Sequence, residues 1–100
     1  MKFSFQVFEI VKNIPKGKVM TYKSVAGKIG SKAYRAVGNV LKNNPDPEHI
    51  PCHRVVKTDL KVGGYFGHID DYLSKEKEIK LKNEGVKIKN GKVNKLCVIL

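Results

Sequence analysis

Breaks in the first half of the sequence limit this chain to short helices. Pro15-Lys16-Gly17, Gly30 and Asn43-Asn44-Pro45 each combine residues that end helices or form tight turns. Between these breaks, apolar residues recur at the spacing of an amphipathic helix. We therefore predict an extended segment at residues 18–20 and three short helices, over residues 3–13, 22–29 and 32–42.

The second and third predicted helices have the features of a helix-turn-helix unit. Thr21 and Ser31 are N-cap residues at their expected starts, and Gly30 favours a left-handed turn between them. Lys32 and Arg35 lie on the later helix, as in a helix that contacts DNA. An ordinary helical hairpin has the same pattern and is commoner, so the pattern alone leaves both open.

The second half of the sequence predicts a stiff loop, one helix and a hairpin. Prolines at both ends of residues 45–51 restrict the backbone there. Val55-Val56 predicts a short buried strand, and Asn90-Gly91 is a strong signal for a hairpin turn. With a helix over residues 72–83, the fold class is mainly α with small β elements, in a single domain over residues 1–100.

The composition favours a globular protein away from membranes. Hydrophobic residues make up 41% of the chain and charged residues 29%, both ordinary for a globular domain. No apolar run approaches the roughly 20 residues of a membrane-spanning helix, and the start of the chain lacks the pattern of a signal peptide. We expect a cytoplasmic protein without membrane contact.

Positive charge is concentrated in the first part of the sequence. The formal net charge is +11, with nine Lys or Arg and one acid in residues 1–44, against eleven bases and eight acids in residues 45–100. A concentrated positive field is expected of a surface that binds phosphates. Because lysines that only solvate the surface give the same composition, charge alone leaves nucleic-acid binding open.

Pro51-Cys52-His53-Arg54-Val55 places a thiol beside an imidazole. The thiolate is the nucleophilic form of cysteine, and an imidazole that takes the proton, directly or through water, generates it. Two cysteines, Cys52 and Cys97, are too few for a zinc finger or ribbon. His49, Cys52 and His53 follow no metal-ligand spacing, so we predict no metal site. A basic chain with an activated thiol suggests nucleophilic chemistry on nucleic acid.

Further segments accompany this string in a distinctive order: Ile14-Pro15-Lys16-Gly17-Lys18-Val19, Thr21-Tyr22, Arg35-Ala36-Val37-Gly38, Asn44-Pro45, Gly64-Tyr65 and Glu84-Gly85. With them the chain, from Val7 to Val93, resembles the C-terminal, active-site domain of the O6-alkylguanine-DNA alkyltransferases. The resemblance implies a winged helix-turn-helix-like DNA-binding domain. Most members of that family also carry an N-terminal domain, which we expect to be missing here.

The resemblance implies a DNA-repair reaction that needs no cofactor. A monomer would bind double-stranded DNA in the minor groove, flip an O6-alkylated guanine out of the stack and move the alkyl group irreversibly to Cys52. By resemblance, His53 is the base that acts through a water, and Glu84 orients it. Asn44 supports the thiolate, and the hydroxyl of Tyr22 donates toward the departing guanine.

The resemblance also implies a base pocket formed by Val55, Phe66, Tyr65, Leu41 and Pro47. The backbone carbonyls of Cys52 and Val55 and the amide of Phe66 would bind the base. Leu41 and Pro47 would form apolar walls.

Contacts with DNA are expected from the helix over residues 32–42. Arg35 would enter the stack and fill the gap left by the flipped base. Small residues permit a close approach to the groove. The other expected contacts are Lys32, Ala33, Tyr34, Ala36 and Gly38.

The sequence departs from the usual family pattern in the second loop and on the DNA-contacting helix. Tyr65-Phe66-Gly67-His68 stands where Tyr-Ser-Gly-Gly is common, which leaves the preferred alkyl group open. Tyr34 replaces a small residue and alters the groove contact or adds a stacking surface. Because the stretch before Glu84 is longer than usual, that assignment rests on the following glycine. Weaker substitutes for Glu84 are Asp70, Asp71, Glu76 and Glu78.

Two alternatives to the repair enzyme remain. Short relatives of the family lack the cysteine and only flag alkylated bases for another pathway; they usually hold tryptophan at that position. This chain has Cys52 there and no tryptophan. A plain helix-turn-helix regulator would explain Arg35 and the charge but gives no role to residues 51–55.

Overall fold

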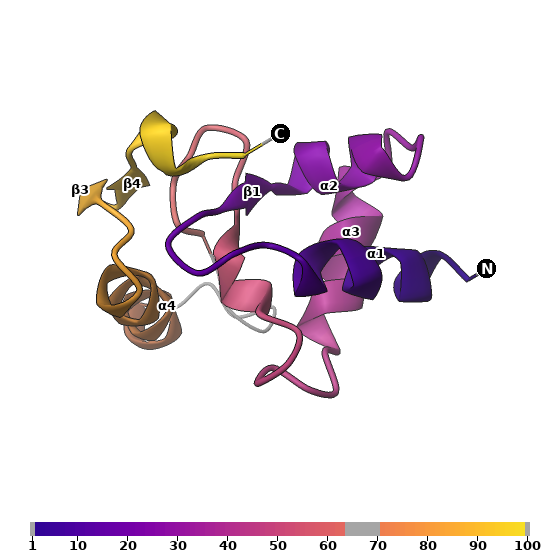
Figure 1. The fold of residues 1–100 in the computed structure, drawn as a ribbon, viewed down its shortest axis with the longest axis horizontal. Helices are drawn as coiled ribbons and strands as arrows, with labels where there is room; N and C mark the ends of the chain where they lie inside the picture. The colour runs from indigo at the N-terminus through magenta and orange to yellow at the C-terminus, as the bar shows by residue number, and fades with distance from the viewer. Residues whose placement is uncertain (1, 64–70, 100) are drawn as a thin grey trace.

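A short parallel strand pair separates the two sides of the fold, which the computed structural model describes over residues 2–63 and 71–99 (Figure 1). One side consists of three helices, α1 (Phe3–Lys12), α2 (Tyr22–Lys28) and α3 (Tyr34–Lys42). The other side consists of α4 (Asp71–Asn83) and a hairpin of β3 (Ile88–Lys89) and β4 (Lys92–Val93). Between them lie β1 (Met20–Thr21), β2 (Val55–Val56) and the 3-10 turn η1 (Cys52–Arg54); a second such turn, η2 (Lys95–Cys97), follows the hairpin.

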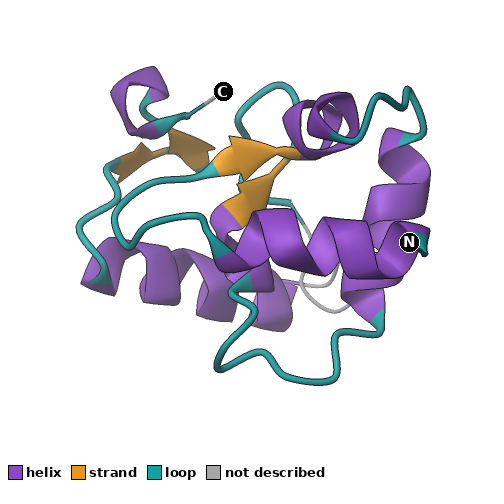
Figure 2. Cartoon of the chain, turned by 45° about the vertical axis from the view of Figure 1, so that its right-hand side comes forward, coloured by secondary structure: helices purple, strands orange, loops and turns teal. Residues whose placement is uncertain are grey.

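The parallel pair of β1 and β2 serves two apolar cores. Met20 pairs with Val55, and both side chains belong to the core between α1, α2 and α3. Val19 and Val56 point the opposite way, into a second core that includes Leu81 of α4. Since successive side chains of an extended segment alternate between its faces, β2 and β1, together with Val19 just before β1, join both halves. Figure 2 shows these strands enclosed by helices on either side.

Most local signals for helix ends and turns are confirmed; the cap of α3 is the exception. The predicted helices over residues 3–13, 22–29 and 72–83 agree with α1, α2 and α4 to within one residue at each end. Thr21 caps α2, because its hydroxyl accepts from the amide of Ser24 at 3.0 Å. Asn90 and Gly91 have φ of 54° and 74°, the positive values that a tight hairpin turn of type I′ requires.

The predicted cap of α3 is wrong. The helix starts at Tyr34 with Ala33 as its N-cap, two residues later than predicted. Ser31 instead completes the end of α2: its amide donates to the carbonyl of Ala26 at 3.0 Å, and Gly30, at φ 77°, donates to Gly27. These two bonds form a Schellman motif. The hydroxyl of Ser31 then accepts from the amide of Ala33, which closes a local turn before α3.

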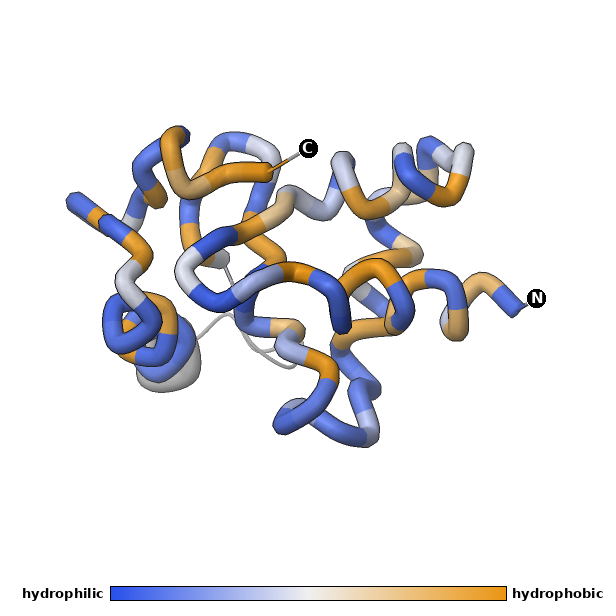
Figure 3. Tube along the Cα trace, in the orientation of Figure 1, coloured by the Kyte–Doolittle hydropathy of each residue, from blue (hydrophilic) through white to orange (hydrophobic). Residues whose placement is uncertain are grey.

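The C-terminal segment lies beside β1. The amide of Val19 donates to the carbonyl of Cys97, and the amide of Ile99 donates to the carbonyl of Val19, both at 2.9 Å. In Figure 3 this segment is apolar, whereas the loop between α3 and η1 is mostly hydrophilic. No helix in the described ranges has the length and apolarity needed to span a bilayer.

Candidate active site and nucleic-acid interface

Cys52 lies at the start of η1, where a side-chain amide holds the preceding loop closed. Asn44 donates through Nδ2 to the carbonyl of Ile50 at 2.7 Å and accepts at Oδ1 from the amide of Asp46 at 2.9 Å. Hydrogen bonding from its side chain acts to lower the pKa of the Cys52 thiol, against the effect of burial. The thiol is 5% exposed and packs in the first core. One asparagine therefore closes the loop and favours the thiolate of Cys52.

A carboxylate from the end of α4 binds the two residues that follow Cys52. Glu84 accepts two hydrogen bonds from Arg54, at 2.9 Å from Nε and 2.7 Å from Nη2. Arg54 Nη1 also donates to the carbonyl of Ile14 at 2.8 Å. His53 Nε2 lies 3.0 Å from Glu84 Oε2, but its N–H direction is out of line for a good hydrogen bond. Glu84 thus ties α4 to η1.

The other candidate carboxylates do not replace Glu84 in the described part of the chain. Glu78 lies 3.4 Å from Lys82, one turn along the same helix. Glu76 is exposed. Asp70 lies outside the described residues, and the side chain of Asp71 is likewise not described. The carboxylate that contacts His53 is Glu84.

Burial keeps the pair of thiol and imidazole neutral. Desolvation raises the pKa of Cys52 above its ordinary value, although the hydrogen bond from Asn44 and the charges of Lys77 and Lys80 oppose it. Desolvation also lowers the pKa of His53, against the attraction of Glu84. Burial alone would raise the pKa of Glu84, but the hydrogen bonds from Arg54 and the attraction of Arg54 and His53 outweigh burial and hold that pKa below its usual value. The site therefore contains a neutral base beside a protonated thiol.

Lys77, which the sequence analysis missed, lies at the centre of this site. It is 1% exposed, and its Nζ lies over the ring of Tyr22, 5.8 Å from the centroid. Burial lowers the pKa of Lys77 to about 7, against the charge of Cys52. Burial and the charge of Cys52 raise the pKa of Tyr22 to about 12. One feature of the sequence could have indicated this role: Lys77 lies on the same helical face as Leu81 and Glu84, which follow it by four and seven residues.

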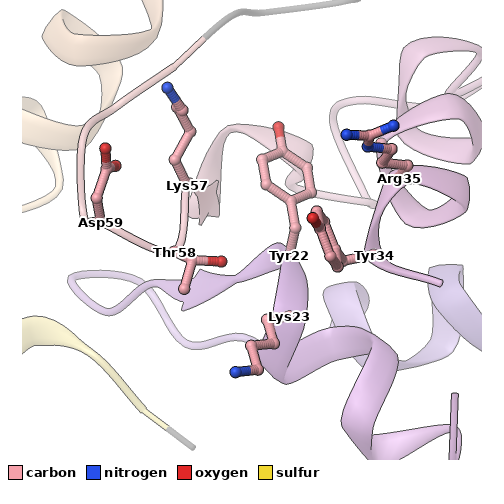
Figure 4. A pocket seen from close by; sticks show the side chains of 8 residues that line it. Tyr22, Lys23, Tyr34, Arg35, Lys57, Thr58 and Asp59 are labelled. Carbon is pink, nitrogen blue, oxygen red and sulfur yellow. The ribbon is translucent and has the colours of Figure 1, made fainter. Parts of the chain in front are cut away.

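A cavity of about 690 Å³ opens beside Tyr22, between α3 and the loop after β2 (Figure 4). Because β1 and β2 are parallel, Tyr22 and Lys57, which follow them, emerge at the same end. The rings of Tyr22 and Tyr34 both face this cavity. The described residues that line it are Tyr22, Lys23, Tyr34, Arg35, Gly38, Lys57, Thr58 and Asp59. Three cations against one carboxylate give the cavity a positive field.

The remaining predicted residues of the helix-turn-helix lie on α3 and at its start. Lys32 and Ala33 are exposed just before the helix, and Ala36 is half-buried within it. Tyr34 is 47% exposed, unusually open for a large aromatic ring. A Cβ added at Gly38 would meet no described atom within 4 Å, so internal packing does not require glycine there.

The predicted base-pocket residues have different environments. Val55 is fully buried in β2, and Leu41 is 4% exposed within the first core. Pro47 is exposed in the loop after α3. Tyr65 and Phe66 fall outside the described residues. The structure therefore brings Cys52, His53, Glu84, Asn44 and Tyr22 together but leaves the second loop of the pocket undescribed.

His49, one of the metal ligands considered from the sequence, contacts an aspartate. Its Nδ1 lies 2.9 Å from Asp46 Oδ2 at the surface. Across residues 2–63 and 71–99, no three His, Cys, Asp or Glu side chains are grouped closely enough to hold a metal ion.

Residues 2–86 match the sequence profile of the family described as 6-O-methylguanine DNA methyltransferase, DNA binding domain. The chain belongs to this family. It is 45% identical over 86 residues to a methylated-DNA--protein-cysteine methyltransferase of Saccharolobus solfataricus, covering 86% of this chain and 52% of that protein. A bifunctional methyltransferase/endonuclease of Picrophilus torridus is 39% identical over 89 residues, covering 88% of this chain and 28% of that protein. The chain thus spans about half the length, or less, of these methyltransferase relatives.

Solved structures give the same family assignment. S. pombe Atl1, in complex with damaged DNA containing O6-carboxymethylguanine, superposes with a TM-score of 0.81 at 28% identity, covering 96% of this chain and 94% of that one. Mycobacterium tuberculosis OGT in complex with DNA gives 0.73 at 34% identity, covering 85% and 50%. The predicted fold class, mainly helical with small strand elements, is therefore confirmed, and the solved structures of this family share that fold.

Proposed function

We propose that this chain is the catalytic part of an O6-alkylguanine-DNA alkyltransferase, which moves the alkyl group of a damaged guanine onto its own Cys52. The observation that carries the proposal is the adjacent pair of Cys52 and His53, both buried, with the carboxylate of Glu84 3.0 Å from His53. A neutral imidazole beside a protonated thiol is the state from which a base can withdraw the proton. No cofactor is needed for this step.

In the proposed reaction the sulfur of Cys52 attacks the alkyl carbon bound to O6. The S–C bond forms as the C–O6 bond breaks, and the electron pair of the broken bond goes to the guanine. His53 takes the thiol proton through a water, and the guanine receives a proton in exchange, with the Tyr22 hydroxyl donating toward it. A raised pKa keeps that hydroxyl protonated at neutral pH. Since the thioether is stable, each molecule reacts once.

The cavity beside Tyr22 is the proposed entrance for a base flipped out of duplex DNA. The cations Lys23, Arg35 and Lys57 line it and suit the flanking phosphates. Arg35, near the start of α3, would fill the gap in the stack. Tyr34 adds a second ring beside Tyr22, a surface on which a base can stack. We place α3 in the minor groove, with the protein bound as a monomer.

A lesion sensor that does not transfer the group is the second candidate. It is favoured by the likeness to Atl1, whose chain is matched over 94% of its length, and by the raised pKa of Cys52. The presence of the thiol and its neighbouring base favours the enzyme.

A transfer assay separates these two candidates. The protein is mixed, at a limiting amount, with excess duplex DNA whose O6-methylguanine carries a radiolabelled methyl group. We expect label to pass to the protein until there is one methyl per molecule and then to stop. If all label stays in the DNA while the damaged duplex still binds more tightly than an intact one, the protein is the sensor.

Replacing Gly38 by alanine is expected to stabilise the fold but weaken DNA binding. The added methyl group finds open space within the protein, and alanine is favoured over glycine within a helix by roughly 0.5–1 kcal/mol. On the proposed interface the same methyl group would hold the groove away, with a loss in affinity of about tenfold, or roughly 1.4 kcal/mol. Thermal unfolding and duplex titration measure the two effects.

Gly27 offers a matched control for this substitution. It lies within α2, is exposed, and likewise has no described atom within 4 Å of an added Cβ. Gly27→Ala should give a similar gain in stability with unchanged DNA affinity. Equal DNA affinity of the Gly38→Ala and Gly27→Ala variants would remove α3 from the proposed interface.

Arg35→Ala is expected to slow alkyl transfer more than it weakens duplex binding. The substitution removes one phosphate-binding charge and also the group proposed to replace the flipped base. Stacking contacts of this kind are worth about 1–3 kcal/mol, so transfer should slow by roughly tenfold. Lys32→Ala, which removes only a charge just before α3, is the control in both assays. Should both variants lose binding and transfer in equal proportion, the assignment of Arg35 fails.

A further inference from the structure

Lys77 is almost completely buried, which is energetically unfavourable for a charged side chain. It is 1% exposed and is among the largest fully buried side chains of the described protein. Lysines are almost never fully buried unless they are paired, because removing an ammonium from water carries a large free-energy cost. A lysine enclosed over the ring of Tyr22 in the centre of a small domain therefore points to a role for its charge.

The position of Lys77 on α4 directs it at the same turn that Glu84 contacts. Residues seven apart lie on one face of a helix, two turns from each other. α4 packs on η1, where Glu84 binds His53 and Arg54. Two turns earlier, Lys77 covers the ring of Tyr22, and its charge acts on Cys52. One helix thus supplies a cation for the thiol and an anion for the imidazole.

We propose that Lys77 is a positioning residue whose ammonium stabilises the thiolate of Cys52 and holds Tyr22 beside it, in the transfer reaction proposed above. The inference rests on that proposed function for its role, but the effect on the thiol exists without DNA. When the proton leaves Cys52, the sulfur becomes an anion inside the core, and Lys77 is the enclosed cation that compensates it. When the sulfur is alkylated it becomes neutral, and Lys77 loses this partner.

The electrostatics of the surrounding groups agree with such a pair. The side chains that interact electrostatically with the sulfur are Tyr22 from α2, Asn44 from the loop after α3, and Lys77 and Lys80 from α4. His53 directly follows Cys52 in η1. Of the two lysines, Lys80 is exposed and Lys77 is not, so water screens the charge of Lys80 far more. Burial lowers the pKa of Lys77, and the charge of Cys52 is the influence that raises it.

The test measures how fast iodoacetamide alkylates Cys52 at a series of pH values. A Cys97→Ala background leaves Cys52 as the single thiol. Lys77→Met should shift the pH profile upward and slow the reaction at neutral pH by about tenfold, the equivalent of one pKa unit. Lys80→Met is the matched control on the same helix and should shift the profile less. Lys77→Arg restores the charge and should recover part of the rate. An unchanged profile in Lys77→Met would reduce Lys77 to a packing role.

Two further readouts do not depend on reactivity. Because burial lowers the pKa of Lys77 from its ordinary value of 10.5 to about 7 in the folded protein, the unfolded chain binds more protons between these two pH values. Stability should therefore rise with pH there. That rise should be absent in Lys77→Met. In the Cys97→Ala background, the pKa of Cys52 followed by NMR should rise in Lys77→Met; an unchanged value contradicts the proposal.

These measurements separate the inference from the proposed function. If Lys77→Met shifts the pH profile but the unsubstituted protein transfers no methyl group from DNA, the interaction of Lys77 with Cys52 stands and the proposed repair reaction fails. If the unsubstituted protein transfers the methyl group but Lys77→Met leaves the pH profile unshifted, the repair reaction stands and the interaction of Lys77 with Cys52 fails.

Discussion

Cys52→Ala is expected to abolish alkyl transfer and leave the affinity for damaged duplex nearly unchanged. Alanine removes the only atom proposed to form the new bond. It keeps a small apolar group at this core position, which is 5% exposed. A serine is less suitable because it would bury a polar hydroxyl there. DNA affinity is expected to persist because it resides mainly in phosphate contacts. Label transfer and fluorescence titration with the same duplex measure the two properties.

Cys97→Ala is the control for this substitution. Cys97 is also buried and also a free cysteine, but it packs in the second core with Val19 and Val56. Its loss should leave transfer intact. If transfer survives in Cys52→Ala and disappears in Cys97→Ala, the nucleophile is Cys97, on the other side of the molecule.

Glu84→Ala is expected to cause the largest loss of stability. The substitution leaves the guanidinium of Arg54 with its bond to the carbonyl of Ile14, in a site where the Arg54 side chain is 16% exposed. Breaking a buried ion pair on one side typically costs about 3–5 kcal/mol, a large fraction of the roughly 5–15 kcal/mol that stabilises a domain. The melting temperature should fall by more than about 10 °C.

This effect should depend on pH in a defined direction. The pKa of Glu84 is held below its usual value by Arg54 and His53, so the carboxylate stabilises the fold above its unfolded pKa. That contribution is lost as the pH falls through the folded value. The difference between the unsubstituted protein and Glu84→Ala should therefore shrink in acid.

Glu78→Ala provides the comparison on the same helix. Its partner Lys82 is 51% exposed and 3.4 Å away, and exposed pairs of this kind contribute about 0.3–0.5 kcal/mol. Similar melting temperatures for Glu84→Ala and Glu78→Ala would show that the contacts of Glu84 do not hold α4 against η1. Since a destabilised variant also loses activity, Glu84→Gln, which keeps a neutral acceptor for Arg54, serves for the rate measurements.

Sequence patterns predicted those elements whose signals are local. Thr21, Gly30 and Asn90-Gly91 act on their own backbone through a cap, a Schellman motif and a hairpin turn. The failed cap at Ser31 has a local cause as well, because two helix ends compete for one residue. The pairing of Met20–Thr21 with Val55–Val56 was not predictable, since two-residue strands carry no periodicity and their partner is more than thirty residues away.

The candidate site was predicted through a motif and not through physics alone. Cys52 and His53 are adjacent in sequence, so their pairing needs no knowledge of the fold. The contact between His53 and Glu84, thirty-one residues later, depends on where α4 lies. Lys77 escaped prediction because lysine on a helix normally faces water. Only the packing of α4 against Tyr22 and Cys52 shows that this one is buried.

The central claim is that the sulfur of Cys52 accepts the alkyl group, and peptide mass spectrometry tests it most directly. After incubation with duplex DNA containing O6-methylguanine, trypsin cleaves after Lys42, Arg54 and Lys95, which places Cys52 in peptide 43–54 and Cys97 in peptide 96–100. We predict that peptide 43–54 gains the mass of one methylene group at Cys52 and that peptide 96–100 is unchanged. An unmodified peptide 43–54 from protein that has bound the damaged duplex would contradict the account.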